Sequence, residues 1–287
     1  MSRNDREQRR RRQLDALVDN VAIDEFHAVQ GVPDLSPVAV VIAAYKEAEN
    51  IARVVEGVPK RLCGLDACVV VVVDGEEDGS TDIVRRAGQF ALSAPVNRGQ
   101  GAALRLGYRV AREHGAQYIV TADADGQTDP ADLETVLGPV VEGSADFVNG
   151  SRRLGTTESS DPVRNSGVVV FAHLISLLTG TKVTDTANPI RAMRAGFSAE
   201  LVLDEPQYQA SELLIGAILH GARYEERPVR MLARSSGTSK KGGNLAYGYR
   251  YSRVVFRTWW RERQRLLGPL RLRARLATEG ARTNSGL

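Results

Sequence analysis

Five consecutive valines, Val69 to Val73, constrain the fold of this chain more than any other feature. Successive side chains of a strand point to opposite faces of its sheet, so a run without a polar residue predicts a strand that is covered on both faces. Strands of this kind belong to sheets that carry helices on both sides. The run therefore predicts the centre of an α/β sheet.

Short apolar runs alternate with helical patterns from Pro37 to about Gly150. This order predicts βαβ units, and hence a mostly parallel sheet with helices on both faces. With 287 residues, 43% hydrophobic and 25% charged, the chain can bury a full-sized core. We predict strands over residues 38–44, 69–73, 118–122, 146–149 and 224–230, helices over 47–58, 81–90, 101–114, 130–142, 167–178 and 211–220, a polar loop over 154–163 and an irregular segment over 184–194.

The two ends of the chain differ from this core. Leu14, Leu17 and Val21 recur at helical spacing, which predicts an amphipathic helix in an N-terminal extension. The net charge of +3 hides a local net of +8 over residues 250–276, which hold nine Arg and one Glu. We divide the chain into an extension over 1–35, a main domain over 36–245 (first half about 36–153, second half about 154–245) and a basic, aromatic tail over 246–287.

Phe256, Trp259 and Trp260 alternate with arginines in this tail. The pattern is compatible with an amphipathic segment at an anionic membrane surface, and equally with a helix that packs its aromatic side chains onto the domain. A nucleic-acid role is disfavoured because no recognition fold accompanies the arginines.

The only cysteines are Cys63 and Cys68, with no histidine near them, which favours a reducing compartment. Residues 1–20 lack the apolar core of a signal peptide. The longest apolar stretch, Gly167 to Leu178, is too short to span a bilayer. We therefore expect a cytoplasmic protein, with peripheral contact at the inner face of the membrane if the tail binds lipid.

Two carboxylates stand one residue apart at the end of the strand over 118–122. Asp123 and Asp125, with the amide oxygen of Gln127, form a hard-oxygen donor set suited to Mg²⁺ or Mn²⁺. An ion at this place usually bridges to phosphate. The alternative is an ordinary acidic turn before a helix, where Asp is favoured electrostatically.

Other polar motifs also fall at strand ends, where ligands of parallel sheets bind. Asp74 begins an acidic turn that could accept hydrogen bonds from a ribose or a base, or could be a glycine-containing turn with a helix cap. Ala44 would let a flat base approach the backbone, and Glu47 could bind ribose. The run Asn97 to Gly101 opens a helix with two glycines and is a weak signal for a phosphate cradle.

Taken together, these motifs resemble the family 2 glycosyltransferases, which have the Rossmann-like GT-A fold. The runs that carry the resemblance are 43–47, 74–80, 97–102 and 123–127, in the family's order. The second half is similar to the polyprenyl-phosphate branch, which includes dolichol-phosphate-mannose-synthase-like enzymes. The matching residues there are Arg152 after the last strand, Arg164, Asp185, Arg191, Arg234, Ser239 and Lys240.

The chain departs from the family at four positions. The usual Pro and Asn of the opening motif are Ala43 and Lys46, and the first Asp of the usual pair is Val73. These changes bear on the identity of the base. Pro189 stands where a glycine is usual, which bears on the acceptor pocket.

The resemblance implies an inverting, metal-dependent transfer from a UDP- or GDP-sugar. It assigns the metal to Asp123, Asp125 and Gln127, and catalysis to Asp125, Glu212 and Arg191. It assigns the acceptor to Arg152, Arg164, Asp185 and Ser239. The donor residues implied are Ala44, Tyr45, Glu47, Asp74, Asn97, Gly101, Asp123, Ala124, Arg234 and Lys240.

The acceptor decides between two forms of this reaction. A hydroxyl needs a general base, for which Glu212 is the candidate, although it could equally be a plain helix N-terminal Glu. A phosphate is already anionic and needs cations such as Arg152, Arg164 and Arg191. We therefore expect polyprenyl phosphate, with a small-molecule, peptide or saccharide hydroxyl as the alternative. A nucleotidyltransferase would need a glycine-rich loop with an Arg and a Lys after the first strand, and residues 44–50 lack one. The intact metal ligands argue against a binding scaffold without enzymatic activity. The oligomeric state stays open.

Overall fold

The computed structural model describes residues 3–158, 162–232 and 248–266. Three predicted site residues, Arg234, Ser239 and Lys240, lie outside these ranges, as does the part of the predicted tail beyond residue 266. Arg164 lies in a described helix, but its side chain falls outside the described part of the structure.

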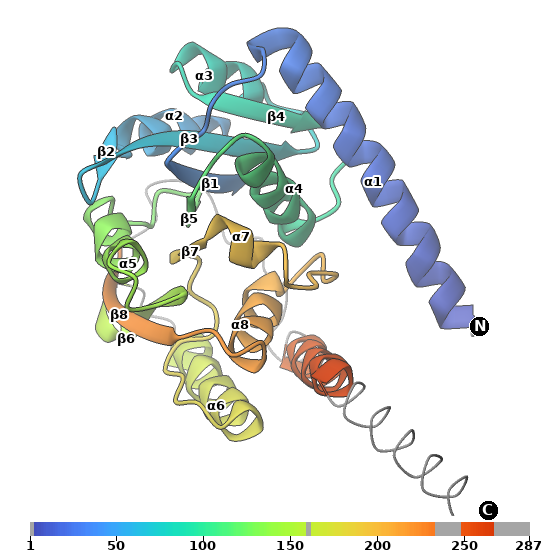
Figure 1. Cartoon of the computed structure of the whole chain (residues 1–287), viewed down its shortest axis with the longest axis vertical. Coiled ribbons are helices and arrows are strands. Elements are labelled where there is room, and N and C mark those ends of the chain that lie inside the picture. The colour runs from blue at the N-terminus through green and yellow to red at the C-terminus, as the bar shows by residue number, and fades with distance from the viewer. Residues whose placement is uncertain (1–2, 159–161, 233–247, 267–287) are drawn as a thin grey trace, which may run out of the picture.

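Four parallel strands form the first half of the sheet (Figure 1). The strand β1 (Val38–Ala44) lies between β3 (Leu65–Asp74) and β5 (Tyr118–Asp123), and β4 (Phe90–Ala94) pairs with the outer edge of β3. Every pairing is parallel, as the alternation of strands and helices predicts.

The second half of the sheet changes direction. The short strand β7 (Arg191–Arg194) lies antiparallel between β5 and β6 (Phe147–Thr157). The strand β8 (Tyr224–Met231) then pairs with β6 in parallel, and β2 (Arg61–Leu62) forms an antiparallel pair with the start of β3. The sheet is thus mixed, with a mostly parallel first half.

Helices cover both faces of the sheet, and the valines of β3 show this directly. Val70 and Val72 belong to a core cluster that includes residues of α1, α4 and α8, whereas Val69, Val71 and Val73 belong to a cluster with residues of α2, α3 and α5. The expected burial on both faces is confirmed.

The helices are α1 (Arg3–Gln30), α2 (Ala48–Gly57), α3 (Ser80–Arg86), α4 (Gln100–Glu113), α5 (Ala131–Val141), α6 (Pro162–Thr179), α7 (Ala195–Ser198) and α8 (Gln209–Leu219), and residues 248–266 form one more.

Three sequence predictions need correction. The helix predicted over 81–90 ends at Arg86, because Gly88 adopts φ 72 and β4 follows directly. The strand predicted over 146–149 continues through residues assigned to a polar loop, because Thr156 and Thr157 pair with β8 after a register shift. The segment expected to be irregular ends in β7.

The C-terminal helix, residues 248–266, packs against the domain while keeping aromatic side chains at the surface. Tyr251 is buried, and Trp259 donates from Nε1 to the carbonyl of Leu178 at 2.8 Å. Phe256 and Trp260 are 48% and 59% exposed. The described part of the tail therefore packs onto the domain through Tyr251 and Trp259, and contact with a membrane stays a prediction. Among the helices in the described ranges, none combines the length and apolarity that a membrane crossing requires.

The close packing of α4 on the sheet gives a test of the fold. A Cβ on Gly107 would lie 2.4 Å from Val41 Cγ1, whereas a Cβ on Gly216 would meet Leu201 Cδ2 at an ordinary 3.6 Å. Gly107→Ala should lower the free energy of unfolding by about 1–3 kcal/mol because it overpacks a rigid core. Gly216→Ala should instead raise it by up to about 1 kcal/mol through helix propensity. Urea unfolding measures both, and equal effects would contradict this account of α4 packing.

Candidate active site

The strand-end motifs meet at one edge of the sheet. In the β1–β3 register Ala44 lies opposite Val73, and in the β1–β5 register Ala43 lies opposite Asp123. Asp74 pairs with Ala94 on the next strand outward. The carboxyl ends of β1, β3 and β5 therefore stand side by side, as expected for a ligand site in a parallel sheet.

Asp74 shapes the loop that precedes α4. Its Oδ2 accepts the backbone N–H groups of Arg98 at 2.8 Å and Gly99 at 2.6 Å. Burial raises the pKa of Asp74 although these donors lower it, and its Oδ1 is buried without a hydrogen-bond partner. Asn97 adds a turn of its own, with Oδ1 accepting the N–H of Gly99 at 3.0 Å. The unsatisfied Oδ1 leaves Asp74 an acceptor for a ligand N–H or O–H.

Two other acids of the same turn accept backbone N–H groups near helix starts. Glu76 accepts the N–H of Gly79 at 2.6 Å, and Asp78 accepts the N–H of Ala48 at 2.9 Å, which ties this turn to the start of α2. The N-cap position of α3 is Gly79, which makes no side-chain cap bond. Val73, at the position of the family's first Asp, is fully buried in the core.

The opening motif forms a tight turn between β1 and α2. Lys46 takes the place of the usual Asn and has φ 54, a conformation that favours Gly or Asn. Its Nζ lies 2.6 Å from Glu77 Oε2 and 5.3 Å from the centre of the Tyr45 ring. Glu47 accepts a hydrogen bond from Asn50 Nδ2 at 3.0 Å. Lys46 thus joins the turn after β1 to the acidic turn after β3.

The acidic run after β5 is held from both sides. Gln100 Nε2 donates to Asp123 Oδ1 at 3.1 Å, and Asp125, only 9% exposed, accepts the N–H of Gln127 at 3.1 Å. Gln127 donates from Nε2 to the carbonyl of Leu232 at 3.1 Å. Ala124 between the two acids is buried. Sequence reasoning missed Gln100, although it lies within the Asn97–Ala102 run.

This donor set fits a divalent cation that is completed by a ligand. Within residues 3–158, 162–232 and 248–266, no group of three or more His, Cys, Asp or Glu could form a cage on its own. Mg²⁺ and its analogues are usually held by one or two carboxylates together with substrate phosphates and water. Asp123 and Asp125 at the sheet edge match that requirement.

Gly101 has a packing role. Its N–H donates to the carbonyl of Pro206 at 2.9 Å, and a Cβ would come within 2.0 Å of the Glu205 carbonyl oxygen. The segment 204–206 therefore rests on the start of α4, and any side chain at 101 would displace it. The structure thus gives a reason for this glycine that is independent of a phosphate.

Arg152 and Asp185 form a buried ion pair where the second half of the main domain begins. Arg152 donates from Nε and Nη2 to the two carboxylate oxygens of Asp185 at 2.6 and 2.8 Å. Burial opposes ionisation of Asp185, but the Arg152 fork and backbone donors outweigh it and lower its pKa. Asp123 lies close enough to stabilise the charge of Arg152. The pair therefore stands beside the acidic run.

Arg191 is buried in the interior. It is 2% exposed and donates to Asn149 Oδ1 at 3.0 Å and to the carbonyl of Ala210 at 2.5 Å. Burial lowers its pKa. In this conformation its contacts join β6, β7 and α8.

Glu212 is also fully buried, and its oxygens are occupied. Oε1 accepts from the N–H of Asp204 at 2.9 Å and from Arg261 Nη1 at 2.8 Å, while Oε2 accepts from the N–H of Glu205 at 2.9 Å. Burial raises the pKa of Glu212, and these donors act against it. The geometry favours a role in holding the segment 204–206. Sequence reasoning missed Arg261, which was grouped with the tail arginines.

The curled, mostly parallel sheet with helices on both faces is a GT-A-type fold. A crystal structure of glucosyl-3-phosphoglycerate synthase from Mycobacterium tuberculosis, in complex with Mn²⁺, UDP and phosphoglyceric acid, superimposes with a TM-score of 0.62 over 84% of this chain and 82% of that one, at 19% identity. Residues 39–201 match the family described as glycosyl transferase family 2. The chain belongs to this family and is a glycosyltransferase.

Two of the relatives are named for activities on dolichyl phosphate or polyprenol. The UDP-N-acetylglucosamine–dolichyl-phosphate N-acetylglucosaminyltransferase of Methanococcus voltae is 28% identical over 73% of this chain and 91% of its own length. The polyprenol monophosphomannose synthase of Mycolicibacterium smegmatis is 30% identical over 71% of this chain and 81% of its own.

The Arg152–Asp185 pair predicts a pH-dependent stability. Asp185→Asn should lower the free energy of unfolding at pH 7 by about 3–5 kcal/mol, because it leaves Arg152 buried without a counter-charge. Since the folded pKa of Asp185 lies below 3.8, the carboxylate stabilises the fold above that pH and loses this effect as the pH falls further. The gap between the urea midpoints of wild type and Asp185→Asn should therefore be smaller at pH 3 than at pH 7.

Asp66→Asn is the matched control, because the Asp66 side chain is 82% exposed and its ion pair within the described ranges is with Arg61 at 3.4 Å. It should change stability by less than about 1 kcal/mol at either pH. A gap between wild type and Asp185→Asn that is the same at both pH values would contradict the pairing.

Proposed function

We propose that this glycosyltransferase moves a sugar, with inversion, from a nucleoside diphosphate sugar to a polyprenyl phosphate at a membrane surface, with Mg²⁺ or Mn²⁺ bound. The observation that carries the proposal is the alignment of Asp74, Asp123 and Asp125 at one sheet edge, next to the small residue Ala44. This is the place where parallel sheets bind nucleotides.

The donor is oriented by the chain's own residues. Asp74 Oδ1 accepts a hydrogen bond from the nucleoside, because this buried oxygen has no hydrogen-bond partner among the described residues and lies 3.8 Å from Arg98 Nε. Ala44 and Ala124 leave room for the flat base and the ribose. Asn97 and Gly101 hold the loop that forms the wall of the site, through Gly99 and Pro206.

The cation is held by Asp123 and Asp125, and Gln127 positions their turn against Leu232. When bound, it neutralises charge that develops on the departing diphosphate. Gln100 holds Asp123 in place from the start of α4. Mn²⁺ and UDP are present in the M. tuberculosis relative with the same fold, which supports this choice of ligands.

A phosphate acceptor suits this site better than a hydroxyl. It needs no general base, and Glu212 has both oxygens occupied by donors of the segment 204–206 and by Arg261. The named activities of the relatives also support a lipid-linked phosphate. Arg164, Arg234, Ser239 and Lys240 stay predicted ligands of the acceptor and the diphosphate.

Exposed apolar residues support contact with a membrane. Leu177 and Val170 on α6 are 82% and 63% exposed, and Phe256, Trp260 and Tyr249 are exposed on the helix over 248–266. The two helices are joined through Trp259 and Leu178. Aromatic side chains with interleaved arginines are typical of segments that lie in a lipid interface.

Asp125→Asn tests the donor site. Transfer from the matching UDP- or GDP-sugar should fall about 100-fold or more, because the charge that holds the cation is halved at its best-buried ligand. Binding of that nucleotide sugar, measured by calorimetry with and without Mn²⁺, should lose its metal dependence. Asp129→Asn, on the same turn but paired with Arg230 at 2.5 Å, should keep it. Full wild-type activity in excess chelator would contradict the metal requirement.

The membrane face is tested with vesicles. Phe256→Ser combined with Trp260→Ser should weaken binding to anionic vesicles about tenfold or more, since burying one large apolar side chain contributes roughly 1.5–3 kcal/mol. Val32→Ser removes an apolar side chain that is 76% exposed outside this face and should leave binding unchanged.

The wild-type protein on the same vesicles, assayed with undecaprenyl phosphate and with undecaprenol, should transfer sugar only to the phosphate. Transfer to a soluble hydroxyl instead would favour the alternative acceptor.

A further inference from the structure

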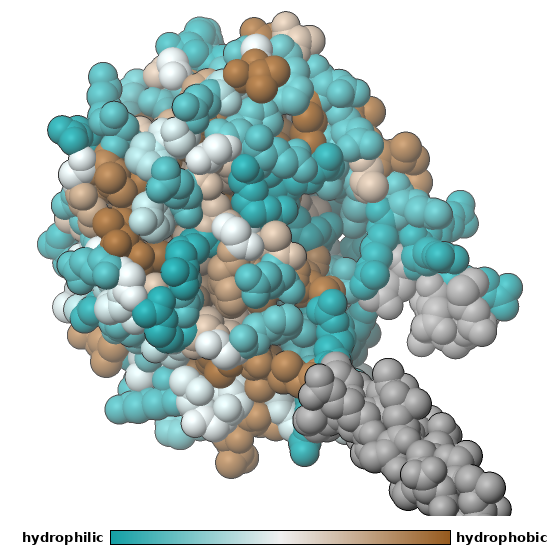
Figure 2. Space-filling view, in the orientation of Figure 1, coloured by the Kyte–Doolittle hydropathy of each residue, from teal (hydrophilic) through white to brown (hydrophobic). Residues whose placement is uncertain are grey.

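The helix α1 has an apolar stripe on its outer side. Leu14, Leu17 and Val21 are 54%, 63% and 56% exposed, and their spacing of three and four residues places them on one face. The face that packs onto the domain is a different one, which contains the buried residues Ala22 and Phe26. Figure 2 shows apolar surface along the right-hand edge of the molecule, where α1 runs. We call Leu14, Leu17 and Val21 the outer stripe.

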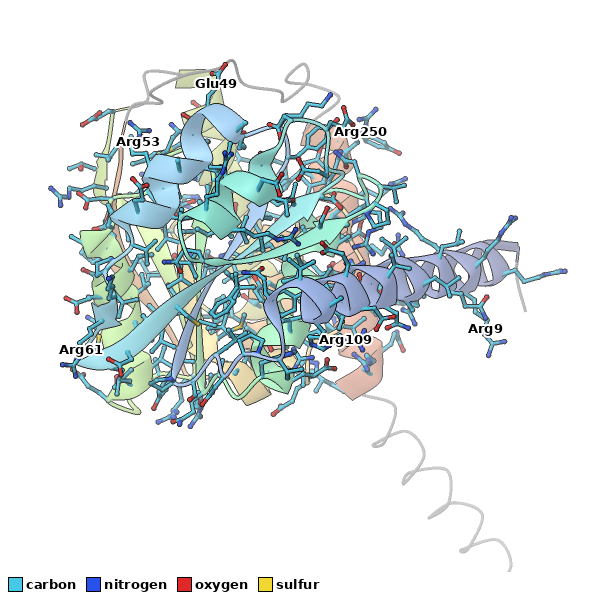
Figure 3. The ribbon with its side chains drawn as sticks, turned by 90° about the horizontal axis from the view of Figure 1, so that it is seen from above. Arg9, Glu49, Arg53, Arg61, Arg109 and Arg250 are labelled. Atoms are coloured by element: carbon cyan, nitrogen blue, oxygen red, sulfur yellow. The ribbon has the colours of Figure 1, made fainter. Side chains whose placement is uncertain are left out.

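The inner face of α1 already binds residues of the domain. The N-terminal half of α1 extends beyond the sheet, and Arg9 lies near its far end (Figures 1 and 3). Beneath it is a cleft of about 660 Å³ that α1 lines with charged residues, including Asp15 and Asp19. Asp15 binds Arg105 at 3.0 Å, and Asp19 binds Arg98 at 2.7 Å. The charged face is thus turned inward, and the apolar stripe is turned to solvent.

The outer stripe ends in opposite charges. Arg10 and Asp24 continue the alternating spacing of three and four residues on either side of it, and both are exposed. Neither takes part in an ion pair within the described ranges, whereas Asp15 and Asp19 on the inner face do, and Glu25, one turn after Val21, pairs with Arg85. A partner that covers the stripe therefore needs an anion near Arg10 and a cation near Asp24.

We propose that the occupant of the outer stripe is a second copy of α1, running antiparallel in a homodimer of this chain. A two-fold axis at Leu17 would place Leu17 against its own copy. It would place Leu14 beside Val21 of the other helix, and Arg10 beside Asp24. Such a self-complementary patch is what a two-fold dimer requires.

Charge complementarity selects this arrangement over two others. A parallel pair would bring Arg10 against Arg10 and Asp24 against Asp24, which is repulsive at both ends. An anionic lipid surface would attract Arg10 and the neighbouring arginines of residues 6–12, but it would repel Asp24 at the other end of the stripe. Exposed ion pairs contribute little affinity and mainly fix orientation, so contact at Leu17 decides whether the dimer forms.

Sedimentation equilibrium of the full chain gives the direct test. Wild type should be a dimer at micromolar concentration. Leu17→Glu places two carboxylates on the axis and should raise the dimer dissociation constant at least about tenfold, a change of 1.4 kcal/mol or more. Its circular dichroism and melting curve, taken as a monomer, should show an intact fold because Leu17 is exposed. Leu177→Glu, at an 82% exposed position on α6, should remain a dimer.

A charge swap tests the orientation. Arg10→Glu and Asp24→Arg should each weaken the dimer several-fold at low salt, and the double variant should restore wild-type affinity. In a parallel dimer the single reversals would replace one repulsive pair with another, and no rescue would follow. Absence of rescue would therefore overturn the antiparallel arrangement.

Two further results would overturn the proposal as a whole. One is a wild-type chain that stays monomeric up to about 100 μM, a range in which functional dimers associate. The other is a Leu17→Glu variant that dimerises like wild type. Loss of vesicle binding by Leu17→Glu in a monomeric protein would identify the membrane as the occupant instead.

Discussion

The parallel, in-register pairing of β1 with β3 and β5 is the constraint on which the rest of the structure depends. Because the three strands end together, Ala44, Asp74 and Asp123 meet at one edge although up to 79 residues separate them along the chain. The register is fixed by burial on both faces, since a shift of one residue would exchange the two sets of valines between the core clusters. The polar site is therefore positioned by apolar packing.

The sequence predicts this half of the fold well because its signals are local and strong. Val69 to Val73 and the helical patterns around it are periodic over their whole length. The elements that were missed are short strands with weak apolar patterns. The strand β4 has the sequence FALSA, and β7 has the sequence RAMR, with both ends charged. Such strands are defined by the neighbours with which they pair, β3 for one and β5 and β6 for the other, rather than by their own residues.

The candidate site shows the same division. Asp74, Asp123 and Asp125 could be proposed because strand-end acids have a pattern of their own. The arginine partners that decide the roles of other carboxylates could not be predicted from the sequence. Glu212 is bound by Arg261, 49 residues away, and Asp185 by Arg152, 33 residues away. Nothing in the local sequence distinguishes a carboxylate held by a distant arginine from one that faces a substrate, so only the fold separates positioning residues from ligands.

These distant pairs also connect the C-terminal helix to the candidate site. Arg261 of that helix binds Glu212, and Glu212 holds the backbone of Asp204 and Glu205. The same segment accepts the N–H of Gly101 through Pro206, at the start of the helix whose Gln100 binds Asp123. The helix that carries Trp260 at its surface and the acids proposed to hold the cation are therefore joined by one continuous set of polar contacts. Because a buried carboxylate that loses its arginine is costly, movement of this helix out of place would be transmitted to the segment 204–206 and so to the donor edge of the sheet.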